Sequence, residues 1–371
     1  MISNHAVFKD GHPVAWPDMR RPRVEVAGIY CPSKGWSYSH HQSITFFKGR
    51  FYAMWSNGHI GEDAAGQRVV IANSADFTHW TAPEQLAQPT IGRDYGENVL
   101  TAAGFHPHEG RLVAYFCEYG PRKEFTRLHA RVTADGEEWG AIHDLGLPVQ
   151  PNHGPQRTAS GRLIISGNIS FPWTDDPSAL AGWKMTGIYP PDMAGLSDNP
   201  SSFWELAKQR GWPVGLCEGS FYQTDDGVLH MLLRAEGDGA RLRTRYRLWQ
   251  TESRDNGLTW SDPVESDFSD TCTKFHFGRL PDRRFYCVSC PVGGGRTPLV
   301  LSLSRDGVKF DQHLILGETH YERRCAGQYK GGEYGYPHTL LHDGYLYVIV
   351  SRQKEAVEVL RVALSELREA P

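Results

Sequence analysis

Residues 253–260 read Ser253-Arg-Asp-Asn-Gly-Leu-Thr-Trp260, and this stretch decides the fold. It follows the strand-like run RLWQTE and precedes SDPVE, so it joins two extended segments. In such a turn Asp255 accepts backbone N–H bonds, Gly257 supplies a positive φ, and Trp260 caps the hairpin with an apolar ring. The pattern S-x-D-x-G-x-T-W therefore predicts a hairpin turn.

Weaker copies of this turn occur elsewhere in the chain. Each keeps the aspartate and an aromatic end, and two of them also keep the glycine: Ser74–Trp80, Thr133–Trp139 and Ser302–Phe310. A unit that recurs at blade-like spacing predicts a repeat architecture.

A second repeat is a pair of strands joined by a short polar turn. Six pairs occur at intervals of roughly 55 to 65 residues, which suits blades of about four strands: HHQSITFFKGRFYAMW, ENVLTAAGFHPHEGRLVAYF, NHGPQRTASGRLIISG, CEGSFYQTDDGVLHMLL, TKFHFGRLPDRRFYCVS and YPHTLLHDGYLYVIVS. We predict an all-β propeller with six four-stranded antiparallel blades. Seven blades is the alternative if the first 35 residues form more than one strand.

The end of the chain predicts how the ring closes. VEVLRVALSEL leaves the last blade one strand short, so HAVFKD or RVEVAG near the N-terminus would complete it and leave no exposed edge strand. We predict a single domain over 1–371. The repeat period stretches at 168–216, where SDNPSSFWELAKQRGW predicts a short helix in an inserted loop around 186–214, either a rim over a pocket or a surface decoration.

Composition narrows the classes of function. The net charge is −4, and no run of Lys and Arg is long enough to follow a phosphate backbone, so nucleic-acid binding is not expected. No stretch of 18 apolar residues is present, so no membrane association is expected. The N-terminus lacks a secretion-signal pattern and the seven cysteines are an odd number, which predicts a cytoplasmic protein unless a leader was removed. No cofactor is expected.

The inner strands of a propeller converge on a central funnel, so residues from different blades meet there. Aligning the six strand pairs by their turns places six polar residues at about one level: His41, Asn98, His153, Glu218, Lys274 and His338. Core packing would favour Val, Ile or Ala instead. We interpret this ring as the lining of a binding site; the alternative is a polar plug with internal hydrogen bonds and buried waters.

Neighbouring residues suggest what this site binds. His40, Gln42, Arg157, His276, Tyr334, Tyr336 and Arg352 lie beside the ring in sequence. A set rich in His, Lys, Arg and Tyr with one Glu favours an anion such as the carboxylate of a uronic or sialic acid. Three histidines could ligate zinc, but no H-x-x-H or H-x-H spacing among these three supports a metal site, and none is predicted.

The repeated turns resemble the Asp-box, or BNR repeat, of the sialidase superfamily. The opening SYSHHQSITFFKGRFYAMWSNG, followed by GEDAAGQRVVIANSADFTHW, resembles propeller L-rhamnosidases acting on rhamnosyl-α-1,4-glucuronate and the related polysaccharide lyases, including ulvan lyases. This resemblance implies a catalytic His41, or failing it His40, with Gln42 beside it. It also implies that this histidine lies on the face opposite the usual propeller pocket.

True sialidases are the other relatives. Similarity to them implies three arginines around a substrate carboxylate, a tyrosine nucleophile with a glutamate, and an acidic aspartate. Arg157 and Arg352 could serve as two of the arginines, and Tyr336 with Glu218 as the nucleophile pair.

We therefore expect a glycosidase that cleaves next to an acidic sugar of an oligosaccharide, rhamnosidase-like in type. The alternatives are a polysaccharide lyase acting at glucuronate, an exo-sialidase, a non-catalytic sugar-binding propeller and a protein-interaction propeller. The catalytic candidates are His41, His40, His153, Glu218 and His338. The substrate-binding candidates are Gln42, Asn98, Arg157, Lys274, His276, Tyr334, Tyr336 and Arg352.

Overall fold

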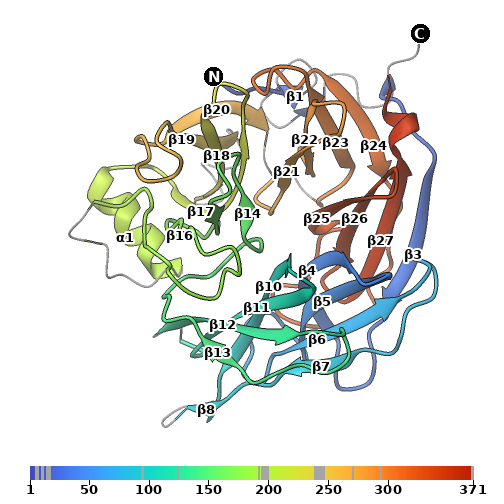
Figure 1. The fold of residues 1–371 in the computed structure, drawn as a ribbon. Coiled ribbons are helices and arrows are strands. Elements are labelled where there is room, and N and C mark those ends of the chain that lie inside the picture. The colour runs from blue at the N-terminus through green and yellow to red at the C-terminus, as the bar shows by residue number, and fades with distance from the viewer. Residues whose placement is uncertain are drawn as a thin grey trace.

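The computed structural model describes residues 1–4, 8–9, 12–13, 18–92, 96–122, 125–190, 193, 200–237, 247–269, 271–292 and 295–368. Within these ranges, six antiparallel sheets of three or four strands stand around a common centre (Figure 1). The β-propeller predicted from the repeats is confirmed, and the six sheets are consistent with the predicted number of blades. No helix in the described ranges is long and apolar enough to cross a membrane.

Each blade begins with its innermost strand. The first blade consists of β4 (Tyr38–Phe47), β5 (Arg50–Gly58), β6 (Arg68–Ser74) and β7 (Glu84–Ala87), and the second of β10 (Val99–His108), β11 (Arg111–Tyr119), β12 (Thr126–Thr133) and β13 (His143–Asp144). The third consists of β14 (Gln156–Arg157), β15 (Leu163–Ile164) and β16 (Trp173–Thr174), and the fourth of β17 (Gly215–Gln223), β18 (Leu229–Glu236), β19 (Arg247–Ser253) and β20 (Val264–Ser269). The fifth consists of β21 (His276–Arg279), β22 (Phe285–Ser289), β23 (Leu299–Ser304) and β24 (Gln312–Gly317), and the sixth of β25 (Gly335–His342), β26 (Tyr345–Arg352), β27 (Ala356–Ala363) and β3 (Val24–Tyr30). Two short hairpins, β1 (Phe8–Lys9) with β2 (His12–Pro13) and β8 (Ile91–Gly92) with β9 (Gly96–Glu97), lie outside the blades, and the 3-10 helix η3 (Leu364–Leu367) follows β27.

The last blade is completed by the N-terminal strand. β3 pairs antiparallel with β27, and Ala27 lies opposite Val359 in the register. In Figure 1 the blue β3 runs along the outer side of the red β27. The segment RVEVAG therefore closes the ring, as one of the two predicted alternatives stated. Most of the other segment, HAVFKD, lies outside the described residues.

The Asp-box turns connect the third and fourth strands of four blades. Asp76, Asp135, Asp255 and Asp306 each accept two backbone N–H bonds at 2.8–3.1 Å from residues two to four positions later. A fifth turn, which sequence reasoning missed, lies after β16, where Asp176 accepts bonds from two backbone N–H groups at 3.1 Å. These turns are scaffold, because they lie at the outer edge of the blades.

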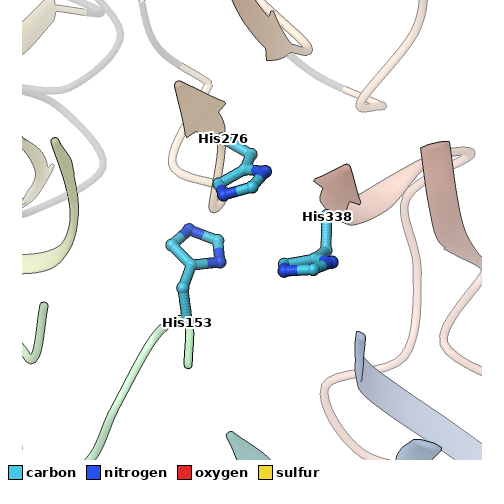
Figure 2. Close-up of side chains that lie close together, drawn as sticks. All are labelled: His153, His276 and His338. Carbon is cyan, nitrogen blue, oxygen red and sulfur yellow. The ribbon is translucent and has the colours of Figure 1, made fainter. Parts of the chain in front are cut away.

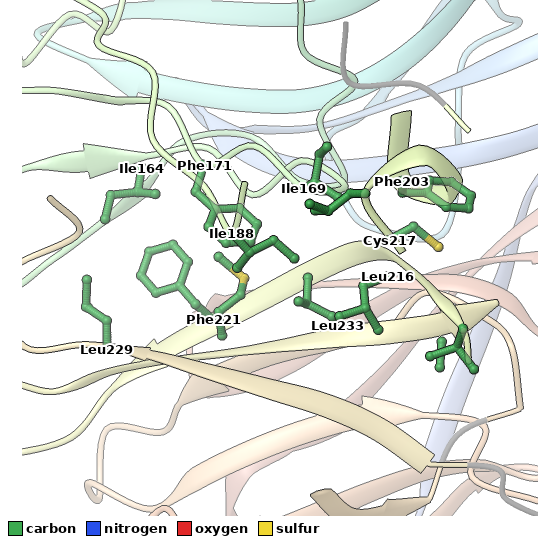
Figure 3. Packing of buried hydrophobic residues seen from close by; sticks show 14 of the residues in the cluster. Ile164, Ile169, Phe171, Ile188, Phe203, Leu216, Cys217, Phe221, Leu229 and Leu233 are labelled. Carbon is green, nitrogen blue, oxygen red and sulfur yellow. The ribbon is translucent and has the colours of Figure 1, made fainter. Parts of the chain in front are cut away.

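The helix α1 (Pro200–Arg210) packs against the inner strand of the fourth blade. Phe203 and Leu206 are buried in a cluster shared with β17 and β18 (Figure 3). The approach is close: a Cβ added at Gly215 would lie 2.5 Å from the Phe203 ring. This packing leaves the neighbouring Trp204 43% exposed at the central pocket, so the helix supplies an aromatic side chain to the pocket mouth.

Replacing Asp255 by Ala should lower the free energy of unfolding by about 1 kcal/mol, because the turn loses its acceptor for Leu258 and Thr259. Activity should be unchanged. Urea denaturation measures the first effect, and Asp262→Ala, with an 80% exposed carboxylate, is the matched control. A selective loss of activity at unchanged stability would show that Asp255 is functional.

Candidate active site

Three inner strands change register near their first residues. The irregularities lie between His40 and Ser43 in β4, between Cys217 and Ser220 in β17, and between Gly335 and His338 in β25. Bulges of this kind turn a side chain away from the regular alternation.

Each irregularity contains one non-glycine residue with left-handed backbone. The φ angles are +55° at His41, +50° at Glu218 and +53° at Tyr336. Such conformations cost about 1–3 kcal/mol each and persist only where the surroundings impose them. The fold therefore holds three strained residues so that their side chains reach one place.

That place is a pocket of about 640 Å³ at the centre of the ring. His41, Glu218 and Tyr336 all line it, and they come from the first, fourth and sixth blades. The charged residues in the rest of its lining are Glu62, Asp63, Arg234, Glu236, Lys274, Arg296, Lys330 and Lys354, and the other aromatic residues are Phe203, Trp204 and Tyr329.

Tyr336 and Glu218 form a hydrogen-bonded pair in the lining of this pocket. The Tyr336 hydroxyl donates to Glu218 Oε1, and Arg234 Nη1 donates to Glu218 Oε2 at 2.5 Å and to Tyr336 Oη at 3.1 Å. Burial, and then the charge of Glu218, hold the pKa of Tyr336 well above its ordinary value. Burial opposes ionisation of Glu218, but the charges of Arg234 and Lys274 outweigh it and lower its pKa. The pair is therefore a neutral phenol beside a carboxylate that can accept its proton.

Two cations beside this pair have unused capacity to bind an anion. Lys274 Nζ lies 4.7 Å from the centre of the Tyr336 ring and has no ion-pair partner among the described residues. Burial lowers the pKa of Lys274. Arg296 donates to the Cys272 carbonyl through Nη2 at 3.2 Å, whereas its buried Nη1 has no acceptor in the described part of the chain. An anionic group in the pocket would supply that acceptor.

Two further carboxylates of the pocket lining belong to the loop after β5. Glu62 is paired with Lys354 at 2.5 Å, accepts a bond from the Tyr38 hydroxyl at 3.2 Å, and lies 4.0 Å from His41 Nε2. Asp63 accepts a bond from the Tyr119 hydroxyl. Glu62 is therefore held in an ion pair, and both carboxyl groups line the pocket.

Two predicted site residues lie behind the pocket. Gln42 Nε2 donates to the backbone oxygens of Gly335 and Tyr336 at 2.7 and 2.5 Å. His40 is fully buried, and its ring lies against the Tyr336 ring, with centroids 3.9 Å apart and planes tilted by 34°. Its Nδ1 is hydrogen-bonded to the Ser351 hydroxyl at 2.7 Å. Burial lowers the pKa of His40 well below its ordinary value, so the ring is neutral. Both residues hold Tyr336 in position without lining the pocket.

Three other predicted residues gather deeper in the channel. His153, His276 and His338 place their rings beside one another (Figure 2), and one nitrogen of each lies within 4.8 Å of the others. None of them lines the pocket. Burial is the main cause that lowers the pKa of all three, to about 4 for His338. The ring of residues predicted at one level therefore separates into a pocket and a buried cluster.

The hydrogen bonds of this histidine cluster argue against a metal ion. The backbone N–H of Thr339 donates to His276 Nδ1 at 3.0 Å, and that of Ile44 donates to His338 Nδ1 at 3.3 Å. A neutral ring that accepts at Nδ1 carries its proton on Nε2, so neither Nε2 can ligate a metal. His153 Nε2 in turn donates to the Phe275 carbonyl at 3.0 Å.

Each of these bonds joins one blade to another, which is the arrangement expected of a polar plug.

Four predicted residues lie away from the pocket. Asn98 is buried and donates to Glu118 Oε1 at 2.9 Å and to Thr90 Oγ1. Arg157 is exposed in a separate hollow and donates to the Gly161 carbonyl. Tyr334 and Arg352 stack on each other, and Arg352 is paired with Glu358 at 2.7 Å. The structure therefore does not bring Arg157 and Arg352 to the central pocket, where Glu218, Lys274 and Tyr336 lie.

Sequence reasoning missed the arginines that do line the pocket. Arg234 was detectable in principle, because hairpin pairing places it opposite Cys217, next to Glu218. Arg296 lies in a loop before β23, and Asp63 in the loop after β5, where no strand alternation indicates the direction of a side chain.

Acid should destabilise the fold through the histidine cluster. The unfolded chain binds protons at histidine near pH 6.5, whereas folded His338 does so near pH 4, so stability should fall as the pH drops between these values. Each such histidine contributes up to about 1.4 kcal/mol per pH unit.

His338→Phe should be less stable at pH 7 but show a shallower loss between pH 6.5 and 4 in urea titrations, while the exposed His143→Phe keeps the wild-type slope. Equal slopes in all three proteins would contradict a titrating cluster.

Known proteins share this arrangement of blades. Residues 49–348 match the model of the BNR repeat-like domain family. Among solved structures, the chain is similar to a sialidase (TM-score 0.65, 18% identity, covering 93% of this chain and 33% of that one). It is also similar to the Trypanosoma rangeli sialidase in complex with 2,3-difluorosialic acid (TM-score 0.64, 13% identity, covering 93% of this chain and 60% of that one). A third similar structure is the Ruminococcus gnavus intramolecular trans-sialidase in complex with oseltamivir carboxylate (TM-score 0.60, 12% identity, covering 93% of this chain and 99% of that one).

These similarities establish the family and the fold of the chain. At such identities the solved structures show the fold alone, and the chain spans a third of the length of the first sialidase and 60% of the second. No curated protein sequence matches the chain. The family model, however, covers most of its length. The chain belongs to the BNR repeat-like domain family, and its fold is that of the sialidase-superfamily β-propellers.

Proposed function

We propose that this protein is a glycoside hydrolase that releases a carboxylated sugar, with Tyr336 as the nucleophile and Glu218 as the base that activates it. The observation that carries the proposal is the Tyr336–Glu218 hydrogen bond in a pocket that also holds Arg234, Lys274 and Arg296. The solved structures of similar fold include sialidases bound to sialic acid and its fluorinated analogue, which supports an acidic sugar as substrate.

A neutral nucleophile suits a substrate whose carboxylate adjoins the reacting carbon. An anionic nucleophile would be repelled by that carboxylate, and the repulsion would be strong in a poorly solvated pocket. Tyr336 avoids it, because its phenol stays neutral until it attacks. As the oxygen of Tyr336 bonds to the anomeric carbon, its proton passes to Glu218, which is ionised at rest.

The leaving oxygen needs a proton at the same time, and we assign the donor to Asp63. It lines the pocket, and its Oδ1 accepts a hydrogen bond from the Tyr119 hydroxyl. In the second step Asp63, now a carboxylate, accepts a proton from the attacking water. The bond between the sugar and Tyr336 breaks, and Glu218 returns its proton to the phenolate, so the enzyme regains its initial state.

The substrate carboxylate would bind Arg296 and Lys274. Arg296 Nη1 lacks an acceptor among the described residues, and Lys274 is held next to the Tyr336 ring. Charge-assisted hydrogen bonds of this kind orient a planar carboxylate and place the anomeric carbon over the nucleophile.

Tyr336→Phe should lower kcat by about three orders of magnitude or more, because it removes the attacking oxygen. Hydrolysis of an aryl sialoside measures the loss, and the melting temperature should stay within a few degrees. Tyr115→Phe, which removes a buried hydroxyl bonded to the Ala179 carbonyl far from the pocket, should keep full activity. Near-normal turnover by Tyr336→Phe would exclude it as the nucleophile.

Lys274→Ala should raise KM for acidic substrates by about ten-fold or more with a smaller effect on kcat, because the carboxylate loses one of its two cations. Steady-state kinetics on the same sialoside tests this, with the exposed Lys309→Ala as control. An unchanged KM would overturn the carboxylate contact.

A second candidate is hydrolysis of rhamnosyl-glucuronate with His41 moving the proton. It is favoured by the place of His41 in the pocket wall, 4.0 Å from Glu62. However, the resemblance to rhamnosidases implied a histidine on the opposite face, whereas His41 shares the pocket with Glu218 and Tyr336.

Two variants separate these candidates. Asp63→Asn should abolish sialoside hydrolysis while His41→Ala retains a measurable fraction; the rhamnosidase hypothesis expects His41→Ala to abolish cleavage of rhamnosyl-glucuronate. Parallel reducing-sugar and ultraviolet readouts distinguish hydrolysis from elimination by a lyase, since only elimination yields an unsaturated uronide. Binding of every sugar without turnover would indicate a lectin-like propeller.

A further inference from the structure

A second cavity lies at the other end of the inner strands. Cys217 and Glu218 near the start of β17 line the pocket, whereas residues 221–223 at the end of the same strand line a cavity of about 380 Å³. Gln156 also lines this cavity, and its Nε2 lies 3.5 Å from His276 Nε2. The histidine cluster therefore stands between the two cavities, and the second one lies toward the face of the propeller opposite the pocket.

This cavity continues into a further one that is rich in arginine. The charged residues in the lining of the first are Arg157, Asp225 and Arg279. The adjoining cavity, of about 370 Å³, shares Asp225 and Arg279 and adds Asp282, Arg283, Arg284 and Arg305. We call the two cavities together the arginine surface. Its residues come from the third, fourth and fifth blades, so the fold gathers them from distant parts of the chain.

We propose that the arginine surface is a second, non-catalytic binding site, and that it holds an acidic polysaccharide through the carboxylate or sulfate groups of that polymer. Neither Tyr336 nor Glu218 takes part in this binding. The second site therefore stands or fails independently of the proposed function.

Positive charge is in excess on the arginine surface. Its five arginines outnumber its two aspartates, although the chain as a whole has a net charge of −4. Asp225 is shared between two of them, since it pairs with Arg279 at 2.7 Å and with Arg283 at 2.8 Å. One carboxylate cannot neutralise two guanidinium groups, so the surface attracts a further anion.

Three of the five arginines are placed to contact a ligand. Arg157 is exposed and donates through Nη1 to the Gly161 carbonyl at 3.1 Å, which leaves the other N–H groups of its guanidinium for a ligand. The side chains of Arg283 and Arg279 are 73% and 33% exposed. Arg284, in contrast, is 12% exposed and pairs with Asp282 at 2.7 Å, so it contributes charge rather than contacts.

The guanidinium group of Arg279 is held in place before any ligand arrives. Its central carbon lies 4.7 Å from the centre of the Phe285 ring, and its Nε donates to the Arg283 carbonyl at 3.0 Å. A group that is already ordered loses little conformational freedom on binding. Guanidinium groups also match the geometry of oxyanions with paired N–H bonds, which favours carboxylate and sulfate groups as ligands.

The extent and lining of the surface favour a polysaccharide over a nucleic acid. Double-stranded DNA carries one negative charge per about 1.7 Å of its axis, and proteins bind it through many phosphate contacts along that length. The arginine surface offers three contact arginines over two small cavities, which suits a polymer with about one charge per sugar. Neutral polar side chains beside Arg157, those of Gln156, Gln223 and Thr224, suit sugar hydroxyl groups.

Binding of the full-length protein to immobilised polymers tests the proposal. Biolayer interferometry at low salt would compare polygalacturonate, which carries carboxylates, dextran sulfate, which carries sulfates, and unsubstituted dextran. We expect at least one acidic polymer to bind and dextran not to bind. Binding to polygalacturonate alone would identify the carboxylate as the bound group, and binding to dextran sulfate alone would identify the sulfate.

Arg157→Gln and Arg283→Gln should each weaken this binding by about three-fold, and the double variant by about ten-fold or more, with melting temperatures within a few degrees of the wild type. Arg254→Gln is the matched control, because Arg254 is also 73% exposed and ion-paired, with Glu252 at 3.2 Å, but lies outside the arginine surface. It should bind as the wild type does. Lys274→Ala, which alters the pocket, should also bind as the wild type does.

Three results would overturn the proposal. In the first, neither acidic polymer binds. In the second, the double variant binds as tightly as the wild type, or Lys274→Ala accounts for the loss, so that the polymer occupies the pocket instead. In the third, single-stranded oligothymidylate binds more tightly than both polysaccharides with the same dependence on Arg157 and Arg283, which would make the ligand a nucleic acid.

Discussion

The pairing of β3 with β27 is the constraint on which the site depends. It joins the N-terminal segment to the last blade and so brings the sixth blade against the first. The contacts across this seam are those that fix the proposed nucleophile: Gln42 of the first blade holds the backbone of Tyr336, and the His40 ring packs against the Tyr336 ring. Folding and assembly of the site are therefore one event, because an open ring would leave Tyr336 without these supports.

The inner strands distribute polar residues by depth in the channel. Along and just before β21, Lys274 lines the pocket, His276 belongs to the histidine cluster and Gly278 lines a hollow beyond it. Residues two apart on a strand share a face. One strand therefore supplies residues to the pocket, to the histidine cluster and to the hollow beyond it. Burial keeps His276 neutral. The cluster therefore fills the channel without adding positive charge beneath Lys274, whose attraction for an anion is left to the pocket.

The propeller was predictable because its signals are local. An aspartate, a glycine and an aromatic residue at fixed spacing define each outer turn, and RVEVAG was recognisable as a missing strand. The site was predictable only in part, because its geometry depends on bulges. Aligning strand pairs put His153 and His338 at the level of Glu218, but the bulge in β25 turns Tyr336 into the pocket and leaves His338 below it. A shift of one residue in register exchanges the two faces of a strand. No pattern in the sequence predicted the bulge that causes this shift.

The pocket also departs from the sialidase pattern in a way that bears on specificity. Similarity to sialidases implies three arginines around the carboxylate, whereas the described lining of the pocket contains Arg234 and Arg296, together with Lys274. Arg234 is engaged with Glu218, so one guanidinium and one ammonium remain for the ligand. A guanidinium matches the planar geometry of a carboxylate with two parallel bonds, but an ammonium is a point charge that accepts an anion from many directions. We therefore expect binding of the substrate carboxylate to depend more on its charge than on its planar shape. Discrimination between acidic sugars would then come from uncharged residues of the pocket, such as Trp204 on α1.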